Sequence, residues 1–412
     1  MQLRFLVQNA LTKRMARLES RRASSRAWVS ALVACACVGA APSPPLAAGY
    51  AQLRSQFNAT SGCWGPDCKE FLWLSANEAH SAANFYALSP SADGASLLRA
   101  VFASLQKQVC NCWRDDQGWV MLSWLRAAAV TGDTTFTVAA QSIFASLVGP
   151  WGAWNISCGG IMWEKGVPYR NAITNELFLT VAMRLHNQTA GTGLDPGPVS
   201  GLTYLQWAQR EWAWFSASAM LPLTDAGVVP DGLSSQNCSL SAIAQGAGNW
   251  TYNSGVLLDG LVLLGDATGD DGSLAAIAMR VARAAAAYFS ADGDAAHVLR
   301  ELGCGRPAGD CSGGKDGQLF KGMFVRHLGY AAALLAAREP VFSSWALSYL
   351  GNQSASIVVN NSSIEPGPSR LAFGVLWQGP YKTDDAEPWV AQGAALDALL
   401  AHELLAQALQ SS

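Results

Sequence analysis

From about residue 70 to the C-terminus, the sequence is a succession of apolar helical segments separated by short loops rich in Gly, Pro and Asp. No comparable series of the alternating, β-branched runs typical of strands accompanies them. The fold class is therefore predicted to be all-α. The expected helices span residues 70–88, 94–109, 116–131, 134–148, 171–187, 200–220, 253–268, 272–290, 319–337, 340–356 and 388–409.

These helices are of two kinds. The segments at 119–130 and 255–267 are apolar on all sides, which is typical of buried helices, whereas the helix at 272–290 carries Arg280 and Arg283 on one side. Both buried segments end in the same Thr-Gly-Asp turn, a weak repeat of helical hairpins. About a dozen inner and outer helices in alternation predict an α/α barrel. A helical solenoid is the alternative, although it normally has a stricter repeat.

Composition limits the partners of this chain. It has 50% hydrophobic and 14% charged residues among 412, which is enough apolar material for one large core. The net charge is −3, and Lys and Arg are not concentrated anywhere after the N-terminus, so nucleic acid is not expected as a partner.

The N-terminus has the layout of a secretory signal. Basic residues up to Arg26 precede an apolar run at 27–41 and a stretch of small residues, with cleavage expected near Ala47 or Ala48. An uncleaved signal anchor, which would attach the protein to a membrane, and an organelle transit peptide are the alternatives. The predicted organisation is a signal peptide or signal anchor at 1–48 and a single domain at 49–412.

Two further features favour the secretory pathway, and hence a secreted or cell-surface protein. Removal of Cys35 and Cys37 with the leader leaves eight cysteines, an even number suited to disulfides in an oxidising compartment. The close pairs Cys63/Cys68 and Cys304/Cys311 are candidates, whereas a zinc site is disfavoured because no histidine lies at finger spacing. N-x-S/T triplets, the acceptors of N-linked glycans, begin at Asn58, Asn155, Asn187, Asn237, Asn249, Asn352, Asn360 and Asn361.

Paired carboxyl groups are the strongest catalytic signal, because hydrolysis of a glycoside needs one carboxylate as nucleophile or base and a second carboxyl as proton donor. Adjacent aspartates occur at 115–116, 270–271 and 384–385. The last two pairs lie just ahead of helices, where Asp is favoured as a cap and by the helix dipole. They are predicted to be structural.

Asp115 and Asp116 have different surroundings. Trp113 and Trp119 flank them, Gly118 allows close approach, and the helix that follows is one of the buried ones. Indole faces beside carboxyl groups suit a sugar site. The lone acids Glu176 and Asp231 are weaker candidates, and the sequence contains no nucleophile elbow, phosphate loop or dinucleotide fingerprint, so no cofactor is predicted.

Four segments together resemble glycoside hydrolase family 76, the α-1,6-mannanases of bacteria and fungi. They occur in the family's order and cover most of residues 70 to 405. The matching segments are DDQGWVMLSWLRAAAVTGD at 115–133, CGGIMWEKGVPYRNAITNELFL at 158–179, NWTYNSGVLLDGL at 249–261 and QLFKGMFVRHLGY at 318–330.

The resemblance implies an (α/α)6 barrel and endo-hydrolysis of α-1,6-linked mannose backbones with retention, so a mannan or other mannose-containing glycan is the expected substrate. It also implies that Asp115 is the nucleophile and Asp116 the acid/base. Residues implied to line the substrate cleft are Trp119, Asn175, Asp231, Tyr252 and Asn253. A transglycosylase using the same pair and a non-catalytic glycan-binding barrel are the alternatives.

The sequence departs from the family pattern at Met162, Ser254 and His327, where Trp, Gln and Asn are expected. The C-terminal segment is an amphipathic helix instead of the hydrophobic tail found in fungal cell-wall members, so a glycolipid anchor is not expected.

Overall fold

The computed structural model describes residues 41–109, 113–149, 158–167, 169–221, 227–234, 237–241, 249–290, 297–301, 315–366, 369–382 and 387–411. Within them lie twelve α-helices: α2 (Pro44–Ser55), α3 (Leu72–Leu88), α4 (Ala92–Gln108), α5 (Arg114–Thr131), α6 (Thr134–Val148), α7 (Ala172–Thr189), α8 (Tyr204–Ala217), α10 (Leu257–Thr268), α11 (Ser273–Phe289), α12 (Lys315–Leu334), α13 (Pro340–Asn360) and α14 (Pro388–Gln410). A 3-10 turn, η1 (Thr251–Ser254), precedes α10.

Three short antiparallel pairs of strands connect these helices. They are β1 (Phe57–Asn58) with β2 (Cys63–Trp64), β3 (Arg170–Asn171) with β4 (Gly232–Leu233), and β5 (Ser362–Glu365) with β6 (Arg370–Phe373). The second pair joins Asn171 to Gly232 and Arg170 to Leu233.

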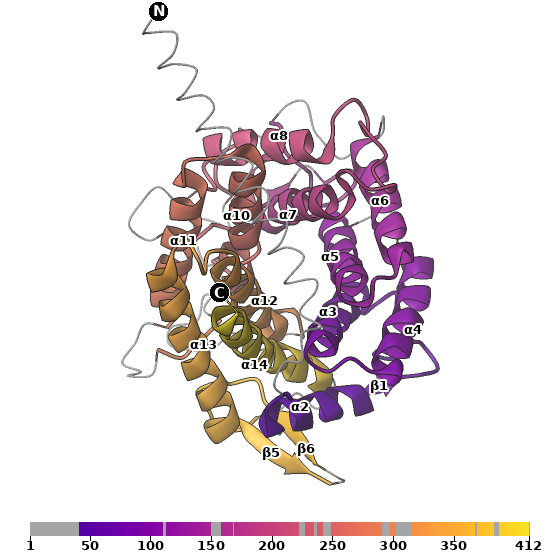
Figure 1. Cartoon of the computed structure of the whole chain (residues 1–412), viewed down its shortest axis with the longest axis vertical. Coiled ribbons are helices and arrows are strands. Elements are labelled where there is room, and N and C mark those ends of the chain that lie inside the picture. Colours follow the sequence, from indigo (N-terminus) through magenta and orange to yellow (C-terminus); the bar gives the residue numbers. More distant parts are fainter. Residues whose placement is uncertain are drawn as a thin grey trace, which may run out of the picture.

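Six helices form a closed inner ring (Figure 1). In ring order they are α3, α5, α7, α10, α12 and α14, each packed on the next, and α14 returns to α3. An outer helix covers each of them: α4, α6, α8, α11, α13 and α2, in the same order. The arrangement is an (α/α)6 barrel, which confirms the predicted fold class. Arg280 and Arg283 lie on the exposed side of α11, as predicted for an outer helix.

Helix α2 closes the barrel against α14 and extends the helical domain toward the N-terminus. Leu46 and Leu53 of α2 are fully buried, and the backbone N–H and hydroxyl of Ser43 donate to the Glu403 carboxylate. Residues 44–48, which the sequence predicts to be part of the leader, lie in α2 in the structure. Among the described residues, no helix is both long and apolar enough to cross a membrane.

The middle of the barrel contains paired charges. Arg326 on α12 donates to Asp397 on α14 at 2.6 Å, and both side chains are almost completely buried. His327 lies 2.6 Å from Asp259 on α10, which also accepts from Arg184 on α7. Because an unpaired charge in such a place is strongly destabilising, these pairs lock neighbouring inner helices together. His327, one of the departures from the family pattern, thus has a partner within the barrel.

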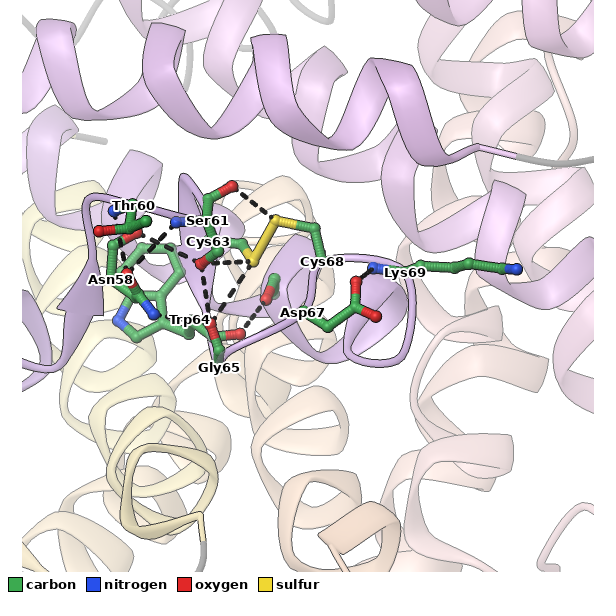
Figure 2. Close-up of a disulfide and its surroundings, with 10 residues drawn as sticks. Asn58, Thr60, Ser61, Cys63, Trp64, Gly65, Asp67, Cys68 and Lys69 are labelled. Carbon is green, nitrogen blue, oxygen red and sulfur yellow. Dashed lines mark hydrogen bonds between the residues drawn. A yellow bond between two sulfur atoms is a disulfide. The ribbon is translucent and has the colours of Figure 1, made fainter.

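The predicted disulfide between Cys63 and Cys68 is present in the loop that leads from β2 into α3, and Figure 2 shows its surroundings. The neighbouring Trp64 is buried and donates its indole N–H to the Leu53 carbonyl of α2 at 2.9 Å. The pair Cys304/Cys311 and the aspartates at 384–385 lie outside the described residues.

Candidate active site

Aromatic side chains gather where the inner helices begin. Trp73 of α3 lies 6.4 Å from Trp119 of α5 and 6.2 Å from Phe320 of α12, between ring centroids. Tyr252 of η1 closes the set, 4.0 Å from Phe320 and 6.4 Å from Trp119. These four rings, called here the aromatic layer, come from the first two turns of α3, α5 and α12 and from the turn before α10. The N-termini of these inner helices therefore meet at one end of the barrel.

Asp115 and Asp116 lie in the first turn of α5, at the same end. The Asp115 carboxylate accepts hydrogen bonds on both oxygens, from the Asp116 backbone N–H at 3.1 Å and from the indole Nε1 of Trp163 at 2.9 Å. The Asn171 side chain is a further hydrogen-bond partner of Asp115. At a helix N-terminus the dipole and these donors all favour a negative charge.

The two carboxyl groups differ in proton affinity. Burial raises the pKa of Asp115 to about 6, although the hydrogen bond from Trp163 opposes the rise. Burial, followed by the charges of Asp115 and Asp316, raises the pKa of Asp116 well above its usual range. Both carboxyl groups therefore bind a proton more tightly than an exposed aspartate, and the charge of Asp115 adds to this effect at Asp116. A carboxylate next to a carboxylic acid can act as nucleophile and proton donor in one step.

A third acid lies beside the pair. Asp231 is 8% exposed and accepts hydrogen bonds from the Tyr169 hydroxyl and, at 3.3 Å, from the Asn253 side chain. Burial raises the pKa of Asp231, and these two hydrogen bonds oppose the rise. Burial and then the charges of Asp231 and Asp115 raise the pKa of Tyr252, so its hydroxyl lies within electrostatic reach of both acids.

The sequence profile described as glycosyl hydrolase family 76 matches residues 100–411. The chain belongs to glycosyl hydrolase family 76.

Curated relatives of this family 76 chain come from fungi. A putative mannan endo-1,6-alpha-mannosidase of Schizosaccharomyces pombe is 32% identical over 276 residues, which are 64% of this chain and 55% of the relative. The mannan endo-1,6-alpha-mannosidase DCW1 of Candida albicans is 25% identical, over 59% of this chain and 50% of the relative. The chain thus spans about half the length of the curated relatives it matches.

Solved structures of the family have the same fold. An alpha-1,6-mannanase of Salegentibacter, solved with alpha-1,6-mannotetrose, superposes with a TM-score of 0.70 at 17% identity, over 87% of this chain and 98% of that one. That structure is of an inactive variant in which two consecutive aspartates are replaced by alanine. Dfg5 from Chaetomium thermophilum, solved with glucosamine, gives a TM-score of 0.62 at 19% identity, over 82% and 81% of the two chains.

The structure separates the sequence-predicted site residues into two groups. Trp119 and Tyr252 belong to the aromatic layer, and Asp231 and Asn253 are hydrogen-bonded to each other beside it. Asn175 is fully buried behind the Asp pair. Its side chain accepts from the Ile161 N–H at 2.7 Å and donates to the Ile161 carbonyl at 3.0 Å.

The other acids considered from the sequence of the family 76 chain are Glu176 and the pair Asp270/Asp271. Glu176 is fully buried, and burial raises its pKa, although a hydrogen bond from the Leu257 backbone at the start of α10 opposes the rise. Asp270 caps α11, accepting from the Leu274 N–H at 3.0 Å, and Asp271 accepts from the Ser273 N–H at 3.2 Å. The pair at 270–271 is thus a helix cap, as predicted.

Sequence reasoning did not single out Trp163, Asn171 or Tyr169. All three lie in the 158–179 segment that carries part of the family resemblance. The many aromatic and polar residues in this segment were the sequence feature that could have pointed to these three side chains. Nothing local could pair Trp163 with Asp115, because the two are 48 positions apart and meet only through the fold of a loop.

Proposed function

We propose that this chain is a glycoside hydrolase that cleaves α-1,6-linked mannose backbones at internal positions, with retention of anomeric configuration. The observation that carries the proposal is the buried pair of carboxyl groups in the first turn of α5, beside the aromatic layer, in which Asp115 accepts hydrogen bonds from Trp163 and from the Asp116 N–H. Relatives named mannan endo-1,6-alpha-mannosidase support the choice of substrate. The inactivity of the Salegentibacter mannanase without two consecutive aspartates supports the choice of residues.

In the first step, the Asp115 carboxylate attacks the anomeric carbon of a mannose residue. The bond from that carbon to the bridging oxygen breaks, and Asp116 gives its proton to the departing oxygen. The products are a shortened mannan with a free hydroxyl group and a glycosyl ester on Asp115. The two aspartates act on the same glycosidic bond, Asp115 at the anomeric carbon and Asp116 at the departing oxygen, as a retaining mechanism requires.

In the second step, water attacks the same carbon. Asp116, now ionised, takes the proton of the water, and the ester bond to Asp115 breaks to restore the carboxylate. Two successive inversions at one carbon give net retention. Neighbouring Cα atoms about 3.8 Å apart allow the two carboxyl groups to reach the ~5 to 5.5 Å separation of retaining enzymes.

Digestion of α-1,6-mannan by the purified protein tests the proposal, with product masses and proton NMR of the newly released anomeric centre as readouts. Internal cleavage gives a ladder of oligosaccharides, and retention gives the α-anomer first. Release of single mannose units alone would contradict endo action, and initial β-anomer would contradict retention. Added acceptor oligosaccharides distinguish a transglycosylase, because the acceptor then appears in elongated products.

We also propose that the protein follows the secretory pathway as one helical domain, beginning near Ser43, behind an N-terminal leader. Two disulfides among the described residues, Cys63–Cys68 and Cys158–Cys238, support an oxidising compartment. N-terminal sequencing of the mature protein tests the boundary. Cleavage after Leu46 would contradict it, because that side chain is fully buried in α2.

A further inference from the structure

Residues 158–163, called here the arm, end at the tryptophan that contacts the catalytic pair. The arm is fixed at its start, where the Trp214 indole of α8 donates to the Cys158 carbonyl at 2.6 Å and Arg170 donates to the Gly159 carbonyl at 2.7 Å. Asn175 then holds both backbone groups of Ile161. Successive peptide groups of the arm are thus anchored to α7, α8 and β3.

The far end of the arm is fixed in the same way. The Arg114 guanidinium donates to the Met162 carbonyl at 3.3 Å, and the Arg114 backbone N–H donates to the Trp163 carbonyl at 2.9 Å. The Trp163 N–H donates to the Tyr169 carbonyl at 2.8 Å. Arg114 is also the first residue of α5, so the arm is attached directly to the helix turn that carries Asp115.

Gly160 allows the arm to lie flat on α8. Its φ of +65° is in the left-handed region that favours glycine. A Cβ at this position would lie 2.3 Å from the indole ring of Trp214, which is too close for any side chain. The start of the arm is therefore pressed against an outer helix and has little room to shift.

A disulfide connects this arm to the other half of the site. Cys158 is bonded to Cys238, 80 positions along the chain. Three residues beyond Cys238, the Ser241 N–H donates to the Gly232 carbonyl at 2.9 Å, directly after Asp231. The Ser241 side chain is also hydrogen-bonded to the Tyr169 hydroxyl, the donor to Asp231.

We propose that the Cys158–Cys238 disulfide is a positioning crosslink of the active site, which joins the arm to the Asp231 loop and thereby keeps the Trp163 indole N–H on the Asp115 carboxylate. The inference rests on the proposed function, since it assigns Asp115 the role of nucleophile. The crosslink acts through Trp163 and does not touch substrate. Without it, the start of the arm is held by its hydrogen bonds and by packing on Trp214 alone, and the direction of the indole toward Asp115 is less restricted.

Two effects on catalysis follow from loss of the crosslink. The Asp115 carboxylate is free to rotate away from the attack direction, which lowers kcat. The hydrogen bond that favours its ionised form weakens, so the pKa of Asp115 rises. Because the nucleophile must be ionised, the acid limb of the pH profile moves to higher pH. A crosslink that served only overall stability would lower the melting temperature without moving that limb.

The test compares Cys158→Ser/Cys238→Ser with a matched control, Cys63→Ser/Cys68→Ser, which removes a disulfide packed between α3 and α4. On α-1,6-mannooligosaccharides we expect the first variant to lose roughly 10- to 100-fold in kcat, the scale of a misplacement of about 1 Å, with a smaller change in KM. Its acid limb should move to higher pH. The control should retain the kcat and pH profile of the parent.

Trp163→Phe, which keeps the ring and removes the N–H, completes a double-mutant cycle. If the disulfide acts through the indole, removing it from the Trp163→Phe protein should lower kcat little further, because the two changes are not additive. Full additivity of the two losses would overturn the proposal. An unchanged kcat and an unchanged acid limb of the pH profile in Cys158→Ser/Cys238→Ser would overturn the proposal as well.

Hydrogen exchange measured on the protein without substrate tests the crosslink independently of the proposed activity. Peptides covering 158–167 and 227–234 should exchange faster in Cys158→Ser/Cys238→Ser and at the parent rate in the control. Unchanged exchange would overturn the crosslink, whereas a parent protein inactive on mannan would overturn only the proposed function. If the serine pair does not fold, Cys158→Ala/Cys238→Asn replaces it, because Cys238 has a φ of +57° and Asn tolerates this left-handed conformation. If neither variant folds while the control does, the disulfide is needed for folding, and the proposal is refuted.

Discussion

The indole Nε1 of Trp163 lies 2.9 Å from Oδ2 of Asp115, although the two residues are 48 positions apart in the chain. This contact, together with the Asp116 N–H on the other oxygen, makes the two neighbouring carboxyl groups unequal. Asp115 has donors that stabilise its charge, and Asp116 has the charge of Asp115 beside it. This asymmetry supports the proposed roles of Asp115 as nucleophile and Asp116 as acid.

The assignment predicts different behaviour for the two single variants. Asp115→Asn should abolish activity on all substrates, because no nucleophile remains to form the glycosyl ester. Asp116→Ala should still be glycosylated by substrates with a good leaving group, and azide should partly restore its turnover. Steady-state rates on aryl mannosides with and without azide measure this. Asp270→Asn/Asp271→Asn, which alters an adjacent pair at a helix cap, is the control and should remain active. Azide rescue of the Asp115 variant instead would reverse the roles.

The dependence of kcat/KM on pH should be bell-shaped. The nucleophile must be ionised, so activity falls as the pH drops through the pKa of Asp115, raised by burial to about 6. The acid must be protonated, so activity also falls at high pH, above the strongly raised pKa of Asp116. Rates measured across pH 4 to 9 check this. A flat profile between pH 4 and 6 would contradict the ionised Asp115.

The pair should also reduce stability at neutral pH. A carboxyl whose folded pKa is raised to about 6 binds its proton more tightly when folded, so stability is lost as the pH rises from about 4 through 6. For a shift of about two pKa units the loss is about 3 kcal/mol. Asp115→Asn should therefore unfold at higher urea concentration than the parent at pH 7, with a smaller difference at pH 4. Equal differences at both pH values would refute this prediction.

Asn175→Ala should lower both stability and turnover. The change leaves the N–H and carbonyl of buried Ile161 without partners, at about 1 to 3 kcal/mol for each group, and releases the arm that carries Trp163. Urea unfolding and the separation of kcat from KM check the effect, and we expect the loss mainly in kcat. Asn175→Asp keeps an acceptor for the Ile161 N–H and should be milder. A large rise in KM with unchanged stability would instead show that Asn175 contacts the sugar.

Two overlapping N-x-S/T triplets should differ in occupancy. Asn360 is exposed at the end of α13, whereas Asn361 is fully buried and donates its side-chain N–H to the Gly374 carbonyl at 2.7 Å. A glycan on that nitrogen has no room in the folded barrel. Enzymatic deglycosylation in oxygen-18 water, followed by peptide mapping of protein from a eukaryotic secretory host, should label Asn360 and not Asn361. Asn360→Gln should remove the label, and a label on Asn361 would contradict the described packing.

The helices were predictable because their apolar patterns are local. The expected segment at 134–148 matches α6 at both ends, and that at 388–409 matches α14 to within one residue. The segment at 200–220 began four residues too early, because the Thr203 capping box that starts α8 was not recognised.

The site was only partly predictable, for a physical reason. Asp115 was a candidate because of the tryptophans beside it and the family resemblance. Its partner Trp163 was not, because the contact depends on the path of a loop fixed by a distant disulfide and by the left-handed turn at Gly160. Cys158 and Cys238 lie 80 positions apart, and sequence spacing carries no information on such a pairing.

Ser43 is bonded to Glu403, which lies about 22 Å along α14 from the helix start at Pro388. That start belongs to the end of the barrel where Asp115 lies, since Trp389 packs at 5.7 Å on Phe71, two residues ahead of Trp73. The polypeptide therefore enters the barrel from the end opposite Asp115 and Asp116. If the protein is attached to a resin or electrode through the chain ahead of Ser43, the end of the barrel with Asp115 and Asp116 faces away from the support. A large polysaccharide can then still reach that end.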